Sequence, residues 1–211
     1  NAKAELLIGG DLRLSHGILR AHRTDDDRAL QRLMAAIAAP DFPSLAPDEL
    51  LEHSRIAMLP LEEMVRRSEI IFVTIQTPHE PRFEGVTRLS SETRDFDYTL
   101  LRAGVKQLSA AIEEAARDRS VVIVSTVLPG TIRKELKPLL GKRSKLCYNP
   151  LFVSMGTAIA DFLNPEFVLF GVDDDDSAAV AEAFYRTIHT APFRRTTLEE
   201  AEIIKVLYNT L

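Results

Sequence analysis

The sequence predicts an α/β protein with a doubly wound, mainly parallel sheet, and three features carry this prediction. Residues 70–75 form an apolar run, rich in β-branched side chains, that only one threonine interrupts, and a second such run covers 121–124. Strands that are buried on both faces of a parallel sheet have this composition. Between the two runs, residues 100–117 place apolar side chains at helical spacing. The order strand, helix, strand predicts a parallel crossover unit.

The other elements are expected from the same kinds of pattern. Short strands are expected at 6–8, 145–148, 167–172 and 193–196. Helices are expected at 28–38, 47–51, 61–67, 131–140, 155–162, 177–189 and 198–211. The acidic run 173–176 is interpreted as a solvated loop in which one aspartate caps the helix that follows. Residues 1–60 give the weakest pattern, and residues 79–94 form a long polar connection.

Composition argues against several classes of function. The net charge of −5 over 211 residues does not favour a broad nucleic-acid surface, and no apolar run is long enough to span a membrane. A single cysteine, Cys147, excludes an internal disulfide and a cysteine-based metal cluster, and the five histidines lack metal-ligand spacing. We therefore expect no metal, no nucleic-acid partner and no membrane partner. The low cysteine content fits a cytoplasmic protein.

Small hydroxylated residues follow both long strands. Thr77 and Pro78 end the first strand, and Ser125 and Thr126 follow the second. Ligands of open α/β sheets bind at the carboxyl ends of the strands, so we expect these residues to meet at one edge and to form the functional centre. The structural alternative is that they only terminate the strands.

A lysine and an asparagine stand four residues apart in the last helix. Lys205 and Asn209 therefore share one helix face, and such a pair could stabilise an oxyanion. Glu202 lies on the same side and is a candidate ion-pair partner for Lys205. The alternative is a solvated helix face with an ordinary ion pair. Asp161 is interpreted as a structural cap or hydrogen-bond anchor.

Four segments, taken in order, resemble the UDP-glucose/GDP-mannose dehydrogenase family. They are IFVTIQTP, VVIVSTVLPGT, CYNPLFVSMGTAIADFLNPEFVLFG and EAEIIKVLYNT, and SLAPDELL upstream of them is also similar. In that family the first two segments are strand ends. The fourth looks like the start of the long helix that joins the two halves of the enzyme. The resemblance extends over most of residues 44–211.

The resemblance implies a Rossmann-like NAD-binding domain at 1–196 and the start of a central dimerisation helix at 197–211. A C-terminal substrate domain would lie outside this sequence. The implied activity is NAD-dependent oxidation of a nucleotide-sugar C6 alcohol to the acid, through a cysteine-bound intermediate. NAD is the implied cofactor, a nucleotide sugar is the implied substrate, and a homodimer through the central helix is the implied assembly.

Residue roles follow from the matching positions. The implied cofactor-binding residues are Thr77, Pro78, Ser125 and Thr126. The implied catalytic residues are Thr126, Lys205 and Asn209. The implied substrate-binding residues are Asn149, Lys205 and Asn209. For Asn149 the alternative is a turn residue that precedes a proline.

The sequence departs from the family pattern at three points. It has no G-x-G-x-x-G motif, since Gly9-Gly10 lacks the spacing. Leu151 and Met155 stand where the family has acidic residues. Cys147 lies in an apolar strand pattern, away from the family's glycine-rich cysteine segment. We therefore expect this chain alone to be inactive. A non-catalytic nucleotide-binding or scaffold protein and a related hydroxyacid dehydrogenase are the alternatives.

Overall fold

The computed structural model describes residues 4–8, 18–21, 56–83, 94–154 and 157–210, and the helices expected at 28–38 and 47–51 lie outside these ranges. The described elements are β1 (Ala4–Ile8), β2 (Ile18–Ala21), β3 (Ile56–Leu59), α4 (Leu61–Arg67), β4 (Ile70–Thr74), η1 (Pro81–Phe83), α5 (Thr99–Ala115), β5 (Arg119–Ile123), η2 (Ile132–Leu136), η3 (Lys137–Leu139), β6 (Ser144–Tyr148), α6 (Ala158–Leu163), β7 (Val168–Gly171), α7 (Asp175–Tyr185), β8 (Phe193–Thr196) and α8 (Leu198–Thr210).

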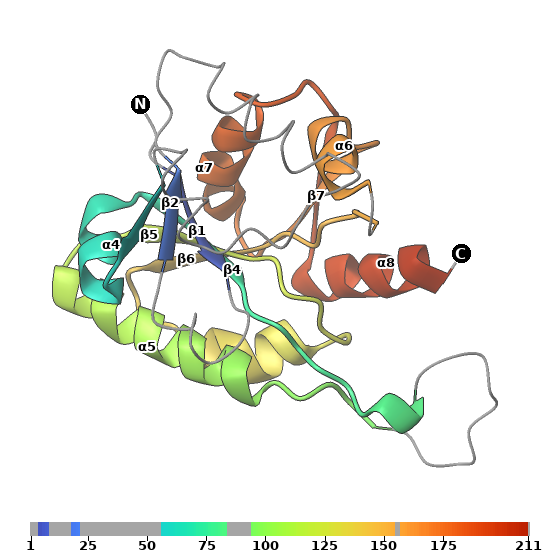
Figure 1. Cartoon of the computed structure of the whole chain (residues 1–211), viewed down its shortest axis with the longest axis horizontal. Helices are drawn as coiled ribbons and strands as arrows, with labels where there is room; N and C mark the ends of the chain where they lie inside the picture. Colours follow the sequence, from blue (N-terminus) through green and yellow to red (C-terminus); the bar gives the residue numbers. More distant parts are fainter. Residues whose placement is uncertain (1–3, 9–17, 22–55, 84–93, 155–156, 211) are drawn as a thin grey trace.

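The described strands form one sheet in the order β3-β2-β1-β4-β5-β6-β7-β8 (Figure 1). The central strands β1, β4, β5 and β6 are parallel, as are β7 and β8. Antiparallel pairs join β1 to β2, β2 to β3, and β6 to β7, the last through Tyr148 and Gly171. The sheet is therefore mainly parallel, as predicted. The strand order reverses between β1 and β4, which is where ligands collect in such sheets.

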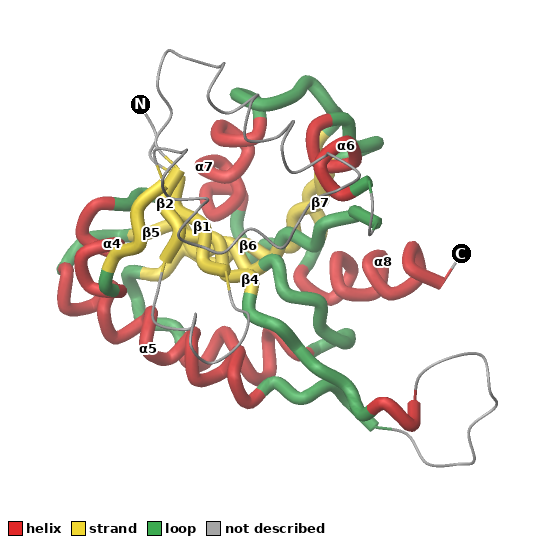
Figure 2. The backbone as a smooth tube through the Cα atoms, in the orientation of Figure 1, coloured by secondary structure: helices red, strands yellow, loops and turns green. Residues whose placement is uncertain are grey.

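Where burial is described, at the centre of the sheet, both faces are buried, which confirms the doubly wound prediction. Ile71 and Val73 of β4 belong to a core that includes residues of α4, α5, η2 and α8. Ile70 and Phe72 of the same strand face the opposite way, into a second core with α7. Alternate side chains of one strand thus pack into two separate layers, which Figure 2 shows as helices on either side of the strands. The strand has no face for water, which explains its nearly continuous apolar sequence.

The helix α5 follows the predicted spacing. Leu101, Val105, Leu108 and Ile112 are all buried, at intervals of three or four residues. The helix ends at Ala116, which adopts the left-handed conformation with φ 52°. Because α5 leads directly into β5, and β5 pairs in parallel with β4, the helix is the crossover that the sequence predicted.

Two other helical predictions have different outcomes. The helix α7 begins after Asp174, whose carboxylate accepts the Ser177 backbone N–H at 2.9 Å, so one aspartate of the acidic run does cap the helix. The segment 131–140 is helical but irregular, with a π-type turn at η2 followed by a 3₁₀ turn at η3. Pro138 provides the reason, because it lacks the N–H that a regular α-helix would use at that position.

None of the described helices has the length and apolar character needed to cross a bilayer.

Candidate functional site

Two side-chain hydrogen bonds tie the loop after β4 to the loop after β5. The hydroxyl of Thr77 donates to the carbonyl oxygen of Thr126 at 2.7 Å, and the hydroxyl of Ser125 donates to the carbonyl oxygen of Ile75 at 2.6 Å. Each loop therefore supplies one donor and one acceptor to the other. The structure confirms that Thr77, Ser125 and Thr126 meet at one edge, and Pro78 follows there as an exposed residue.

The hydroxyls at this edge differ in what they can still bind. Ser125 is buried and its hydroxyl already donates to Ile75. Thr77 is half-buried and also uses its proton within the edge. Thr126 is half-buried, and its hydroxyl has no hydrogen-bond partner in the part of the chain that the structure describes. The Thr126 hydroxyl can therefore both donate to and accept from a ligand at this edge.

The backbone beyond Thr126 is held from the start of α5. The hydroxyl of Tyr98 accepts the backbone N–H of Leu128 at 3.0 Å and donates to a carboxylate oxygen of Asp95 at 2.6 Å. Burial, together with the bond to Asp95, raises the pKa of Tyr98 to about 12, so the hydroxyl keeps the proton that it donates. Tyr98 is 3% exposed. The sequence pattern indicated that this residue lies near a helix start but not that it contacts the turn after β5.

Lys205 and Asn209 lie side by side on α8, as predicted. The Lys205 ammonium donates to Asn209 Oδ1 at 3.0 Å and to the carbonyl oxygen of Leu151 at 2.7 Å. It also lies 5.3 Å from the centre of the Phe152 ring, within range of a cation–π contact. Lys205 is 6% exposed, and burial lowers its pKa. Lys205 is therefore not a solvated side chain, whereas Asn209 beside it is exposed.

Glu202 was a candidate ion-pair partner for Lys205, but in the structure its carboxylate has other partners. Glu202 is buried, and its carboxylate accepts the backbone N–H groups of Gly130 and Ile132. Lys205 instead contacts a backbone carbonyl. The reason is that α8 crosses close to the turn after β5, where unpaired backbone donors compete successfully for the carboxylate.

Asn149 was expected to contact a substrate, and its surroundings do not fit that role. Asn149 is fully buried, its amide donates to the carbonyl of Leu169 at 2.9 Å, and its side-chain oxygen accepts the Tyr185 hydroxyl at 2.5 Å. Its backbone N–H also donates to the carbonyl of Ile123 at 2.8 Å. Asn149 thus joins β5, β6, β7 and α7, and it fixes the start of the loop that leads to Leu151.

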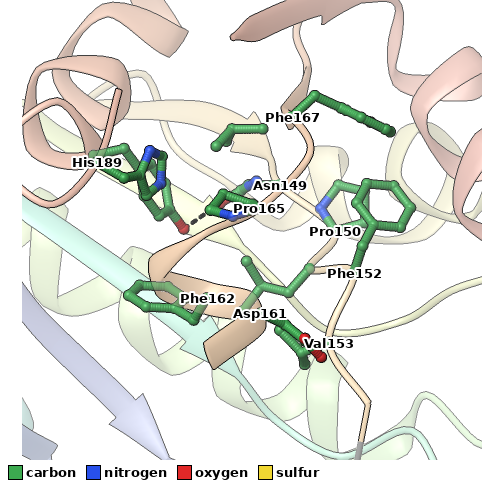
Figure 3. Close-up of a pocket in the computed structure, with 12 residues that line it drawn as sticks. Asn149, Pro150, Phe152, Val153, Asp161, Phe162, Pro165, Phe167 and His189 are labelled. Carbon is green, nitrogen blue, oxygen red and sulfur yellow. Dashed lines mark hydrogen bonds between the residues drawn. The ribbon is translucent and has the colours of Figure 1, made fainter. Parts of the chain in front are cut away.

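A small cavity of about 20 Å³ lies beside Asn149, between the loop after β6, α6 and α7 (Figure 3). A cavity needs roughly 10–15 Å³ to hold one water, so this one is far too small for a nucleotide. Asp161 lines it and accepts the Ser154 N–H and the Thr157 hydroxyl, which confirms its reading as an anchor. His189 also lines it, and burial lowers the pKa of that imidazole.

Cys147 is fully buried in β6, in the core that faces α7. Burial raises the pKa of its thiol, so the sulfur remains a neutral, unreactive group. The structural reading of Cys147 is therefore confirmed. Within the described ranges, no group of three or more histidine, cysteine, aspartate or glutamate side chains could hold a metal ion.

Comparison with known proteins gives a consistent result. Residues 37–189 match the model of the UDP-glucose/GDP-mannose dehydrogenase family, NAD binding domain. The GDP-mannose 6-dehydrogenase of Pseudomonas aeruginosa is 30% identical over 156 residues, which is 70% of this chain and 33% of that protein. UDP-glucose 6-dehydrogenase TuaD of Bacillus subtilis is 27% identical over 188 residues, 86% of this chain and 37% of that protein.

A solved structure agrees with the sequence matches. The ternary complex of GDP-mannose dehydrogenase from Pseudomonas aeruginosa has a TM-score of 0.61 and 28% identity to this chain, and the match covers 71% of this chain and 34% of that one. The chain therefore spans about a third of the length of such relatives.

The described residues fit the NAD that the matched domain binds. Two adjoining parallel strands end in a cross-linked edge, and one hydroxyl of that edge, on Thr126, is open to a ligand. Beyond β1, the chain returns as the antiparallel strand β2. A phosphate-binding glycine motif of the usual kind opens a helix that leads to a parallel strand, so the β1–β2 pairing agrees with the absence of that motif from the sequence.

Proposed function

The chain belongs to the UDP-glucose/GDP-mannose dehydrogenase family, and we propose that it forms the NAD-binding part of an enzyme that oxidises a nucleotide sugar. The observation that carries this proposal is the cross-linked edge of β4 and β5, where Thr77 donates to the Thr126 carbonyl and leaves the Thr126 hydroxyl open. The edge lies at the carboxyl ends of two parallel strands and next to the β1–β4 pair, where the strand order reverses and where an open α/β sheet binds its ligands.

Within this proposal, each residue of the edge has a limited role. NAD, when bound, supplies a hydride acceptor. The Thr126 hydroxyl bonds a polar group at the nicotinamide end, and Thr77 keeps the Thr126 backbone in place. Pro78 and Ser125 shape the edge without donating to the cofactor, because one lacks an N–H and the other is already bonded within the edge.

Lys205 and Asn209 are proposed to act on the sugar alcohol. An ammonium beside the alcohol oxygen stabilises the negative charge that develops there as a hydride leaves the carbon. Asn209 holds the ammonium through its side-chain oxygen, and the Leu151 carbonyl holds it from the other side. Lys205 is thus kept in place before a substrate binds, which is what such stabilisation requires.

We propose UDP-glucose, GDP-mannose or UDP-N-acetylmannosamine as the substrate class, by analogy with the relatives named above and with the resemblance described first. We also propose that this chain by itself does not complete the oxidation. A four-electron oxidation needs a thiolate to hold the aldehyde, and the one cysteine of the sequence is a buried neutral thiol. Leu151 cannot move a proton either.

A second copy of the chain is the proposed partner. The helix α8 exposes Ile203, Leu207 and Tyr208 by 45%, 55% and 43%. Exposed apolar side chains on one helix favour association, and the family resemblance points to a homodimer through this helix. Light scattering should therefore show a dimer that forms as the protein concentration rises. A monomer at every concentration would contradict the proposal.

The alternative is a non-catalytic nucleotide-binding protein, which Leu151 and the missing glycine motif favour. Calorimetric titration with NAD, NADH and NADP tests the cofactor part of the proposal, because heat of binding with NAD or NADH supports it and its absence overturns it.

An NADH-absorbance assay with the three nucleotide sugars then separates the two functions. Turnover in wild type that disappears in Cys147→Ser would refute our interpretation of that cysteine. Turnover in both would refute inactivity of the chain alone.

A further inference from the structure

The helix α8 carries a buried acid that the proposed chemistry does not use. Glu202 is 0% exposed. Moving a carboxylate out of water is unfavourable unless hydrogen bonds replace the lost solvent. Burial raises the pKa of Glu202, and bonds from two backbone N–H groups act against that rise. A buried carboxylate with two such bonds is therefore a specific contact between α8 and another part of the chain.

The groups that Glu202 binds belong to the turn after β5. Its two carboxylate oxygens accept the N–H of Gly130 at 2.5 Å and the N–H of Ile132 at 2.7 Å. Ile132 is the first residue of η2, and the first N–H groups of a helix have no partner within the helix. The side chain of Thr131, just before η2, makes no capping bond. Glu202 supplies the missing acceptors from 70 residues further along the chain.

This turn is held at every second residue by a side chain from another element. Thr77 binds the carbonyl of Thr126, Tyr98 binds the N–H of Leu128, and Glu202 binds the N–H groups of Gly130 and Ile132. Gly130 has φ +90°, a conformation that other residues rarely adopt. The backbone from 126 to 132 therefore has one defined path, and Glu202 fixes the end farthest from β5.

The same helix also fixes the catalytic candidate. Lys205 follows Glu202 by three residues and contacts the Leu151 carbonyl in the loop after β6. A helix is rigid over this distance, so the two contacts together set the turn after β5 relative to the Lys205 ammonium. Thr126 opens that turn.

We propose that Glu202 is a positioning residue. It holds the turn after β5 so that Thr126 faces the cofactor at a fixed position relative to the Lys205 ammonium. The inference rests on the proposed function of the same edge. Glu202 touches neither cofactor nor substrate, and it acts only through the backbone of Gly130 and Ile132.

The variant Glu202→Gln tests this inference because it keeps the size of the side chain but offers one acceptor oxygen to two N–H groups. Amide hydrogen exchange, followed by NMR, should be about tenfold faster at Gly130 or Ile132 than in wild type, as expected for one lost bond to a charged group. NAD titration of the folded variant should show affinity weakened several-fold. Glu202→Asp, which shortens the side chain, serves for the same measurements where the glutamine variant does not fold.

Two controls separate positioning from stability. Glu199→Gln removes a carboxylate of the same helix that binds the exposed Arg133 of η2, and it should leave both amides and NAD affinity unchanged. Val168→Ala lowers stability from the core that faces α7, which contains none of residues 126–132, and it should also leave NAD affinity unchanged. If both amides of Glu202→Gln exchange at the same rate as in wild type, or if its NAD affinity is unaltered, the inference is overturned. Failure of wild type to bind NAD overturns the proposed function instead, while the amide result still decides whether Glu202 holds the turn.

Discussion

Replacing Tyr185 with phenylalanine removes one hydroxyl from a buried polar contact and little else. Tyr185 is 2% exposed, and its hydroxyl donates to the side-chain oxygen of Asn149, which is itself fully buried, at 2.5 Å. Its ring packs against Phe72, Phe162 and Phe170, and phenylalanine retains those contacts. The change therefore isolates the hydrogen bond that anchors Asn149.

The magnitude follows from the burial of the partner that remains. A hydrogen bond is worth about 0.5–1.5 kcal/mol net, but a buried acceptor that is left unsatisfied costs about 1–3 kcal/mol. Asn149 is fully buried, so the larger range applies and the free energy of unfolding should fall by about 1–3 kcal/mol. For a protein of this size each kcal/mol corresponds to about 2–4 °C in Tm.

Urea denaturation followed by circular dichroism measures the effect, with Tm as a second readout. Tyr208→Phe is the matched control, because Tyr208 is 43% exposed and the loss of its hydroxyl should change stability by less than about 0.5 kcal/mol. If Tyr185→Phe is as stable as wild type, Asn149 is not the structural anchor described here, and its assignment as a substrate residue returns.

Three further predictions concern local features. Ala116→Gly should stabilise the protein by about 0.5–1 kcal/mol in urea, because Ala116 has φ 52° and glycine adopts this conformation without strain. Cys147 should react with a thiol reagent only after unfolding, since it is buried and its pKa is raised; rapid native-state labelling at pH 8 would contradict this. Hydrogen bonds from Ser177 lower the pKa of Asp174, so its capping contribution of about 1 kcal/mol is present above its unfolded pKa and is lost as pH falls through its folded pKa. The destabilisation caused by Asp174→Ala should therefore be smaller at pH 3 than at pH 7, and an equal effect at both would refute the cap.

Local patterns predicted the elements that lie at the centre of the fold. The sequence of β4 is apolar on both faces because the strand contacts two cores. The spacing of the apolar residues in α5 indicates the one face that this helix buries. The antiparallel pairing of β6 with β7 left no such trace. It rests on one residue pair, Tyr148 with Gly171, and neither residue differs from what a parallel strand would contain.

In the site, too, local patterns predicted some contacts and not others. Thr77 and Thr126 could be placed together from sequence because parallel strands end at one edge of the sheet. Lys205 and Asn209 could be placed together because residues four apart lie on the same face of a helix. The role of Glu202 could not be predicted, because its partner Gly130 lies 72 positions away and backbone donors have no sequence signature. The contacts of Asn149 could not be predicted for a related reason, since its partners Leu169 and Tyr185 belong to β7 and α7.

Calorimetric titration of NAD into wild type and Thr126→Val tests the central claim most directly. If the cofactor binds at the edge of β4 and β5 through the Thr126 hydroxyl, the variant should bind NAD more weakly by about 1 kcal/mol, or about fivefold. Thr190→Val, a change at an exposed threonine beyond α7, should bind like wild type. Equal NAD affinity in wild type and Thr126→Val, with clear binding by both, would contradict the assignment of this edge as the cofactor site.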